Sequence, residues 1–94
     1  MALTTVIAYD VSEDARRARL AALLQMHGDR IQFSVFLCRL DDGELDELVD
    51  AAERIINVNT DSLYVFRQCP TCWGNRECRG QSKPPERTLY WIAF

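Results

Sequence analysis

Apolar and polar residues follow one another in blocks whose lengths suit short strands and two helices. Apolar and β-branched residues fill 4–9 and 62–68, which predicts a strand in each place. A third stretch of this kind, 30–40, contains neither glycine nor proline. Its pattern leaves open whether it is one long strand or two strands joined by a tight bend. A last apolar run, 88–94, predicts a C-terminal strand.

Two segments have the hydrophobic spacing of amphipathic helices. In 13–27 the apolar residues recur every three or four positions, with Ser12 as the expected N-cap and Gly28 as the stop. The second segment, 42–56, follows a run of acidic residues typical of a helix start and contains a clear apolar stripe. His27 lies on the apolar side of the first helix, so we expect it to pack rather than to act as a general base.

The expected order of elements, β-α-β(β)-α-β-β, predicts an α+β fold, a ferredoxin-like βαββαβ sandwich with an extra C-terminal strand. The 94 residues form a single domain, 1–94, in which 69–88 is a long cysteine-containing loop. Two helices cover one face of such a sheet, whereas 4–9 and 62–68 carry consecutive apolar residues that require burial on both faces. We therefore expect a homodimer through the sheet faces, with strand 88–94 able to pair across the contact.

The composition favours a cytoplasmic protein without a membrane segment. No apolar run approaches the roughly 18–20 residues of a membrane span, and the N-terminus lacks the positive charge and cleavage site of a signal peptide. The net charge is -3, but the acidic residues are concentrated in 41–61, and the segments on either side of it are net basic. Any contact with nucleic acid must therefore come from local basic patches.

Asp10 is the first candidate for chemistry, because it ends a predicted strand just before a helix. A carboxylate in that place can hold a hard divalent cation such as Mg²⁺, or it can satisfy the amides of the helix start. One aspartate is a poor metal site. A two-fold axis that brought two copies of Asp10 together would double the ligands and let a bound metal activate water against a phosphodiester.

Several short motifs stand at a specific spacing between residues 3 and 68: Ile7-Ala8-Tyr9-Asp10-Val11-Ser12, Arg16-Arg17, Leu23-Leu24 to Gly28, Gln32-Phe33-Ser34-Val35-Phe36 and Arg39-Leu40. With these motifs the chain resembles the CRISPR-associated Cas2 family. The resemblance implies a ferredoxin-like homodimer, a metal-dependent endonuclease of endoribonuclease type and a part in spacer acquisition. It also places Ser34 and Phe36 near the dimer axis, where packing and hydrogen bonding explain them better than catalysis does.

The same resemblance implies roles for single residues. Asp10 becomes the catalytic residue, and one Asp10 from each subunit holds Mg²⁺ or Mn²⁺. Arg16, Arg17 and Arg19 become candidates for contacts with the backbone of RNA or DNA. These three arginines fall within one helical turn and cannot all point the same way, so a solvated helix face is the alternative for at least one of them.

The segment 69–78 departs from the common family pattern. Cys69, Cys72 and Cys78 form a C-x2-C pair with a third cysteine, which is typical of a zinc loop, but a fourth ligand is missing because Cys38 belongs to a strand. Structural disulfides are rare in the cytoplasm. Thioredoxin-type redox chemistry needs the motif to open a helix, and the residues that follow Cys72 do not predict one. The other alternative is a contact surface for the integrase or for DNA.

Three functions follow from this reasoning. The first is a subunit of CRISPR adaptation that cleaves RNA or DNA phosphodiesters. The second is a non-catalytic DNA-binding dimer that bridges two integrase dimers and clamps duplex DNA by its phosphates. The third is a toxin-like ribonuclease on the same fold, which would act without the integrase. The loss of cleavage on changing Asp10 to alanine would favour the first.

Overall fold

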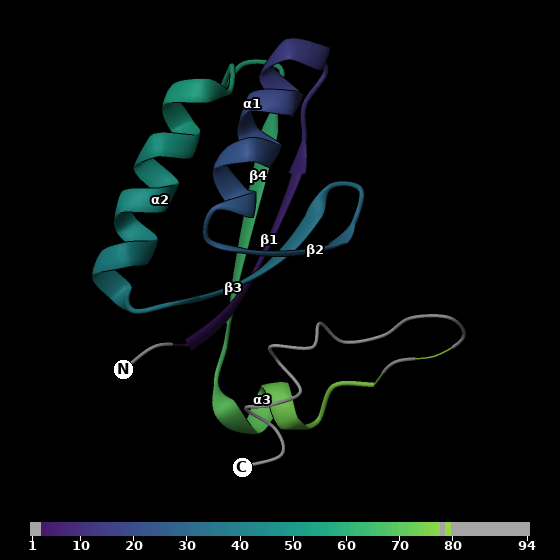
Figure 1. Cartoon of the computed structure of the whole chain (residues 1–94), viewed down its shortest axis with the longest axis vertical. Coiled ribbons are helices and arrows are strands. Elements are labelled where there is room, and N and C mark those ends of the chain that lie inside the picture. Colours follow the sequence, from purple (N-terminus) through teal and green to yellow (C-terminus); the bar gives the residue numbers. More distant parts are fainter. Residues whose placement is uncertain (1–2, 78, 80–94) are drawn as a thin grey trace.

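Two helices cover one face of a four-stranded antiparallel sheet in the computed structural model, which describes residues 3–77 and 79 (Figure 1). The strand order is β2-β3-β1-β4. The strands are β1 (Leu3–Asp10), β2 (Gly28–Gln32), β3 (Val35–Leu40) and β4 (Ser62–Gln68); the helices are α1 (Asp14–Gln25), α2 (Asp42–Ile55) and the short α3 (Pro70–Gly74).

This topology confirms the predicted split βαβ arrangement. The central strand β1 pairs antiparallel with both β3 and β4, and β2 and β3 form a hairpin at one side. The predicted strand 88–94 lies outside the described residues, and the expected homodimer stays a prediction. In the part of the chain that the structure describes, no helix is long and apolar enough to cross a membrane.

The start of α2 is fixed by a capping box. The Asp41 side chain accepts a hydrogen bond from the backbone N–H of Glu44 at 2.8 Å, and the Glu44 carboxylate accepts one from the backbone N–H of Asp41 at 3.1 Å. The two bonds satisfy donors that a helix start leaves without partners inside the helix. The predicted apolar stripe of this helix is present, and Leu45 and Leu48 on it are buried.

The helix α1 begins and ends differently from the prediction. Glu13, not Ser12, occupies the N-cap position and makes no capping side-chain hydrogen bond, because the Ser12 hydroxyl donates to Asp61 instead. The helix ends at Gln25, since the chain must turn to enter β2 at once. His27 therefore lies beyond the helix and is exposed, so the prediction that it packs is wrong.

The segment 30–40 forms two strands, and the break falls at Phe33 and Ser34. The backbone N–H of Tyr9 donates to the carbonyl oxygen of Ser34 at 3.1 Å, and the Tyr9 hydroxyl donates to the carbonyl oxygen of Phe33 at 3.3 Å. The turn is therefore held by β1. This long-range anchoring, which the local pattern does not contain, sets the break that the sequence left open.

Gly28 is the first residue of β2, at a point where the chain lies very close to β3. A Cβ atom placed on it would lie 2.1 Å from the carbonyl oxygen of Leu37 and 2.7 Å from the Sγ of Cys38. Real Cβ atoms do not approach other atoms so closely. The sequence predicts Gly28 only as a helix stop, whereas the structure also requires glycine there for packing.

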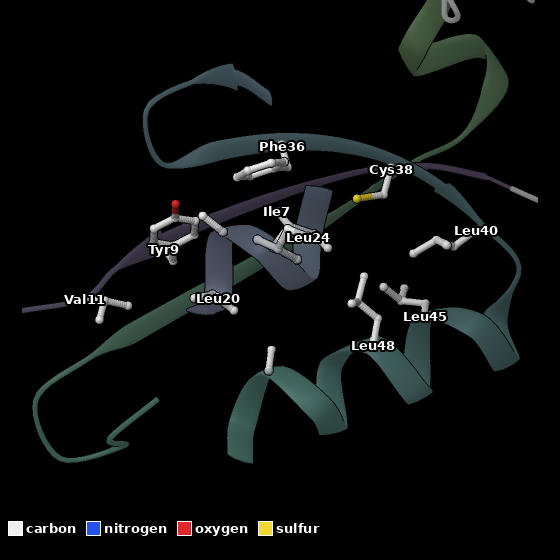
Figure 2. Close-up of a cluster of buried hydrophobic side chains, with 12 residues drawn as sticks. Ile7, Tyr9, Val11, Leu20, Leu24, Phe36, Cys38, Leu40, Leu45 and Leu48 are labelled. Atoms are coloured by element: carbon white, nitrogen blue, oxygen red, sulfur yellow. The ribbon is translucent and has the colours of Figure 1, made fainter. Parts of the chain in front are cut away.

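Twelve buried side chains among the described residues form the core between the sheet and the helices (Figure 2). The sheet and both long helices contribute to this core: Ile7 and Phe36 come from the sheet, Leu20 and Leu24 from α1, and Leu48 from α2. Full burial of such a side chain contributes about 1.5–3 kcal/mol. Phe36 is fully buried in this core, so it packs inside its own chain rather than at a contact between two chains.

The opposite face of the sheet, away from α1 and α2, carries apolar side chains. We call it the open face and define it by Val6 and Ala8 of β1 and their partners Phe66 and Tyr64 on β4. Tyr64 and Phe66 are 50% and 52% exposed, and their rings stack with centroids 6.5 Å apart. This face is where the described part of the chain leaves large aromatic side chains half exposed.

The residues after β4 do not begin with a loop, as the sequence predicts for 69–88. Cys69 is the N-cap of α3, and Pro70 occupies the first position of this short helix, where its missing N–H costs nothing. The prediction of a loop is therefore wrong for 70–74, which are helical. The C-x2-C motif opens this helix, contrary to the prediction that it would not.

Candidate functional site

Asp10 is the last residue of the central strand and is exposed. It pairs with Ser62 at the end of β4 where the chain enters the strand. Side chains two residues apart on a strand share a face, so Asp10 lies on the same side as Ala8 and Val6, at the edge of the open face. Within residues 3–77 and 79, no residue forms a hydrogen bond or ion pair with its carboxylate.

The amides of the helix start are satisfied by a different carboxylate. Asp61 accepts hydrogen bonds from the backbone N–H of Ser12 at 3.1 Å and from the backbone N–H of Asn57 at 2.9 Å. The hydroxyls of Ser12 and Thr60 donate to the same carboxylate, each at 3.2 Å. The alternative in which Asp10 serves the helix start is therefore not what the fold uses. Asp10 is left available for a ligand.

Arg16 forms a two-point ion pair with Asp61. Its Nε lies 2.9 Å from Oδ2 and its Nη2 lies 3.3 Å from Oδ1, while Nη1 lies 3.3 Å from the carboxylate of Glu13. The Asp61 side chain is fully buried and that of Arg16 is 22% exposed. The hydrogen bond from Arg16, helped by the backbone N–H of Asn57 and opposed by burial, holds the pKa of Asp61 well below its ordinary value.

The three arginines predicted to bind nucleic acid are therefore not equivalent. Arg16 is tied to Asp61. Arg17 donates to the carbonyl oxygen of Val11 at 2.8 Å and pairs with Asp14. Arg19 is exposed, and no described residue engages it. A contact between these side chains and a nucleic acid stays a prediction, and Arg19 is the residue best placed to make one without breaking an existing ion pair.

Asp61 is the residue that the sequence reasoning missed. It is the only buried acidic side chain among the described residues, yet in the sequence it stands at the end of the acidic segment 41–61, most of which is exposed. The available signal was its position: the residue before β4 lies next to the residues that follow β1, because β1 and β4 are antiparallel neighbours.

The donor set at Asp10 fits a hard divalent cation only in part. Carboxylate oxygen is the ligand that Mg²⁺ prefers, and Mg²⁺ usually keeps several waters beside one or two carboxylates. In the described part of the chain, no group of three or more histidine, cysteine or acidic residues could hold a metal ion. At this place the described residues supply one suitable carboxylate, that of Asp10, and a second copy of the chain would supply another.

The described cysteines differ sharply in exposure. Cys38 is buried in the core, and this burial raises the pKa of its thiol to about 11. Cys69 and Cys72 are exposed on α3 and neither forms a disulfide. Cys78 lies outside the described residues, so the three-cysteine zinc loop stays a prediction. Cys38 takes no part in it, since its thiol faces the core from the middle of β3.

A family model described as CRISPR associated protein Cas2 matches residues 2–76. This chain belongs to the CRISPR-associated Cas2 family. A CRISPR-associated endoribonuclease Cas2 of Rhodospirillum rubrum is 37% identical to it over 87 residues, which cover 93% of this chain and 70% of the relative. Another relative of that name, from Chloroflexus aurantiacus, is 37% identical over 82 residues and covers 86% and 88% of the two chains.

Solved structures agree with this membership. The crystal structure of a hypothetical protein from Thermus thermophilus matches with a TM-score of 0.81 and 35% identity, over 92% of this chain and 100% of the other. The crystal structure of Streptococcus pyogenes Cas2 at pH 6.5 matches with a TM-score of 0.74 and 25% identity, over 83% and 100%. The resemblance predicted from the motifs around Asp10 is thus confirmed at the level of the Cas2 family and its fold.

Proposed function

We propose that this chain is a metal-dependent endonuclease of CRISPR spacer acquisition and that Asp10 is its metal-binding residue. The observation that carries the proposal is the exposed carboxylate of Asp10 at the end of the central strand, free of any hydrogen bond or ion pair to a described residue. Relatives named endoribonuclease make RNA the first substrate to test and DNA the second.

The proposal requires two copies of the chain packed through their open faces. Tyr64 and Phe66 are each half exposed there, and complete burial of an aromatic side chain contributes about 1.5–3 kcal/mol. Asp10 lies on the same face of β1 as Ala8, at the edge of this apolar surface. An isologous contact over the open face would therefore present the two Asp10 carboxylates near one two-fold axis.

The residues around Asp10 supply a fixed support. Its backbone pairs with Ser62. Beyond this pair, Asp61, which precedes β4, forms hydrogen bonds with Ser12 and Arg16, which follow β1. This network holds the chain that follows Asp10, and the bond from the backbone N–H of Tyr9 to the carbonyl oxygen of Ser34 holds the residue before it, so the carboxylate projects from a supported backbone, which a metal site requires. The two Asp10 carboxylates would hold Mg²⁺ or Mn²⁺, which when bound supplies a Lewis acid and lowers the pKa of a coordinated water.

The test is cleavage of labelled single-stranded RNA and of duplex DNA by the full-length purified protein with Mg²⁺, with Mn²⁺ and with EDTA. Loss of a group that only supports a metal ligand costs roughly 10–100-fold in activity, so we expect Asp10→Asn to lose about 100-fold or more. The matched control is Asp50→Asn, the same change at an exposed position of α2. Equal, EDTA-sensitive cleavage by Asp10→Asn and the unchanged protein would overturn the assignment.

A second candidate function is a non-catalytic DNA-binding dimer that bridges two integrase dimers. It is supported by the finding that the described part of a single chain offers one carboxylate and no three-ligand metal group. Spacer integration with the integrase partner separates the two functions. Integration that survives in Asp10→Asn favours the bridging role, and integration that is lost together with cleavage favours the enzyme. A toxin-like ribonuclease would cleave RNA and leave integration unaffected in every variant.

A further inference from the structure

The thiols of Cys69 and Cys72 lie next to each other on the surface. Cys69 is the N-cap of α3, and its Sγ accepts a hydrogen bond from the backbone N–H of Cys72 at 3.2 Å. Both side chains are exposed, so a reagent in solution can reach either sulfur. The 3.2 Å contact places the Cys69 sulfur against the backbone of Cys72, the residue that carries the second thiol.

We propose that Cys69 and Cys72 are a redox-active dithiol, which small-molecule disulfides such as oxidised glutathione convert reversibly into an intramolecular disulfide. The motif Cys69-Pro70-Thr71-Cys72 holds the pair in one short turn, with the proline fixing the backbone between the two sulfurs. Closing the ring requires a change of side-chain rotamers together with an adjustment of the backbone at the start of α3.

The chemistry proceeds in two exchange steps. The Cys69 thiolate, having lost its proton to solvent, attacks one sulfur of oxidised glutathione; a mixed disulfide forms and one glutathione thiolate leaves. The Cys72 thiol then loses its proton and attacks the Cys69 sulfur, which releases the second glutathione thiolate and closes the Cys69–Cys72 disulfide. The two protons pass to the two departing thiolates. In total the protein dithiol loses two electrons, and oxidised glutathione gains them as two reduced molecules.

The two cysteines are chemically distinct in a way that suits these steps. The Cys72 side chain, together with the backbone N–H of Cys72, lowers the pKa of Cys69, and the neighbouring Cys69 side chain raises the pKa of Cys72. Cys69 is therefore the better first nucleophile at neutral pH, and Cys72 is the resolving thiol. Cys38 does not compete, because burial keeps it protonated and out of reach.

The pair is separate from the proposed nuclease site. α3 follows β4 at the end of the sheet where Thr4 pairs with Gln68, whereas Asp10 pairs with Ser62 at the other end (Figure 1). Thr4 and Asp10 are six positions apart along β1, a span of roughly 20 Å. A substitution that abolishes the chemistry of one site is therefore expected to leave the other site unchanged, and the dithiol proposal does not depend on the proposed nuclease function.

The test uses the full-length reduced protein, equilibrated in buffers of increasing ratio of oxidised to reduced glutathione and then trapped with a maleimide mass tag. We expect two thiols to disappear in one transition, reversed by dithiothreitol, with peptide mapping that joins Cys69 to Cys72. Cys72→Ser should stop at a glutathione adduct on Cys69. Cys69→Ser should lose its first thiol about tenfold more slowly than Cys72→Ser does.

The matched controls are Cys38→Ala and Cys78→Ser, both of which should keep the two-thiol transition. A disulfide that joins Cys69 or Cys72 to Cys78, or to a second chain, would overturn the proposal. So would two thiols that stay reduced at every ratio. A tightly bound zinc ion that is retained through purification and blocks oxidation would also overturn it and favour the zinc loop instead.

Discussion

Arg16 and Asp61 are 45 residues apart in the sequence, and they meet in a two-point ion pair whose carboxylate is fully buried. The pair joins the start of α1 to the turn before β4, and Asp61 is the residue before Ser62, which pairs with the candidate metal-binding residue Asp10. An exposed ion pair contributes little to stability, but removing one partner of a buried pair leaves the other charge without compensation. Asp61 therefore belongs to the framework of the fold.

The first prediction concerns this carboxylate. Because the folded-state pKa of Asp61 is depressed, its charge adds stability above the ordinary carboxyl pKa of about 4, and this stability is lost as the pH falls below that value. We expect Asp61→Asn to lower Tm at pH 7 by more than about 5 °C. The difference in Tm from the unchanged protein should shrink between about pH 5 and pH 3.

The matched control for that experiment is Asp50→Asn, whose exposed carboxylate should leave Tm within about 2 °C at every pH. Thermal unfolding followed by circular dichroism measures both variants. A difference for Asp61→Asn that stays constant down to pH 3 would contradict the depressed pKa.

The second prediction separates Arg16 from Arg19. Arg16→Ala should lower Tm, because it leaves the buried Asp61 without its cation. Arg19→Ala should leave Tm unchanged and weaken binding of RNA or DNA, with a loss of about 1 in the slope of log affinity against log salt. Fluorescence anisotropy with a labelled oligonucleotide at several salt concentrations gives this slope. An unchanged slope in Arg19→Ala would remove Arg19 from the list of phosphate contacts.

The third prediction concerns Gly28. Gly28→Ala places a Cβ against the backbone of Leu37, which cannot move without breaking the β2–β3 hairpin, so we expect a loss of about 3 kcal/mol in the free energy of unfolding. Urea denaturation measures this loss. Gly74→Ala is the control, because a Cβ there meets no atom within 4 Å. Equal stability of the two variants would contradict the close approach at Gly28.

The fourth prediction concerns the open face. Tyr64→Ser and Phe66→Ser should shift a dimer toward monomers, because each removes an exposed aromatic side chain that the proposed contact buries. Light scattering coupled to size-exclusion chromatography measures the change. Met26→Ser, at a residue 79% exposed just after α1, is the control and should leave the mass unchanged. A protein that is monomeric at all concentrations before any substitution would refute the face-to-face dimer.

The strands β1 and β4 and the helix α2 follow from local signals in the sequence. Apolar runs mark the strands, and Asp41 with Glu44 marks the start of the helix, because these signals act within a few residues. The order of strands also follows, since short connections restrict a β-α-β-β-α-β chain to few topologies. The availability of Asp10 agrees with its predicted role, although metal binding itself stays a prediction.

Two of the features that the sequence did not reveal depend on distant contacts, and a third depends on local signals with more than one meaning. The break at Phe33 and Ser34 is held by Tyr9, and the start of α1 is held by Asp61 rather than by a local cap. The helix α3 was missed because proline and glycine at its two ends read as loop signals, although proline is well tolerated in the first turn of a helix.

The position of β1 determines when the fold can be completed. It is synthesised before its neighbour β4, which follows more than fifty residues later, so Thr4 can pair with Gln68 only after residue 68 has been made. Until then one edge of the central strand has no partner, and pairing over such a separation in sequence is intrinsically slow. A nascent chain that stalls before residue 68 would therefore expose an unpaired edge of β1, which could pair with a strand of another chain.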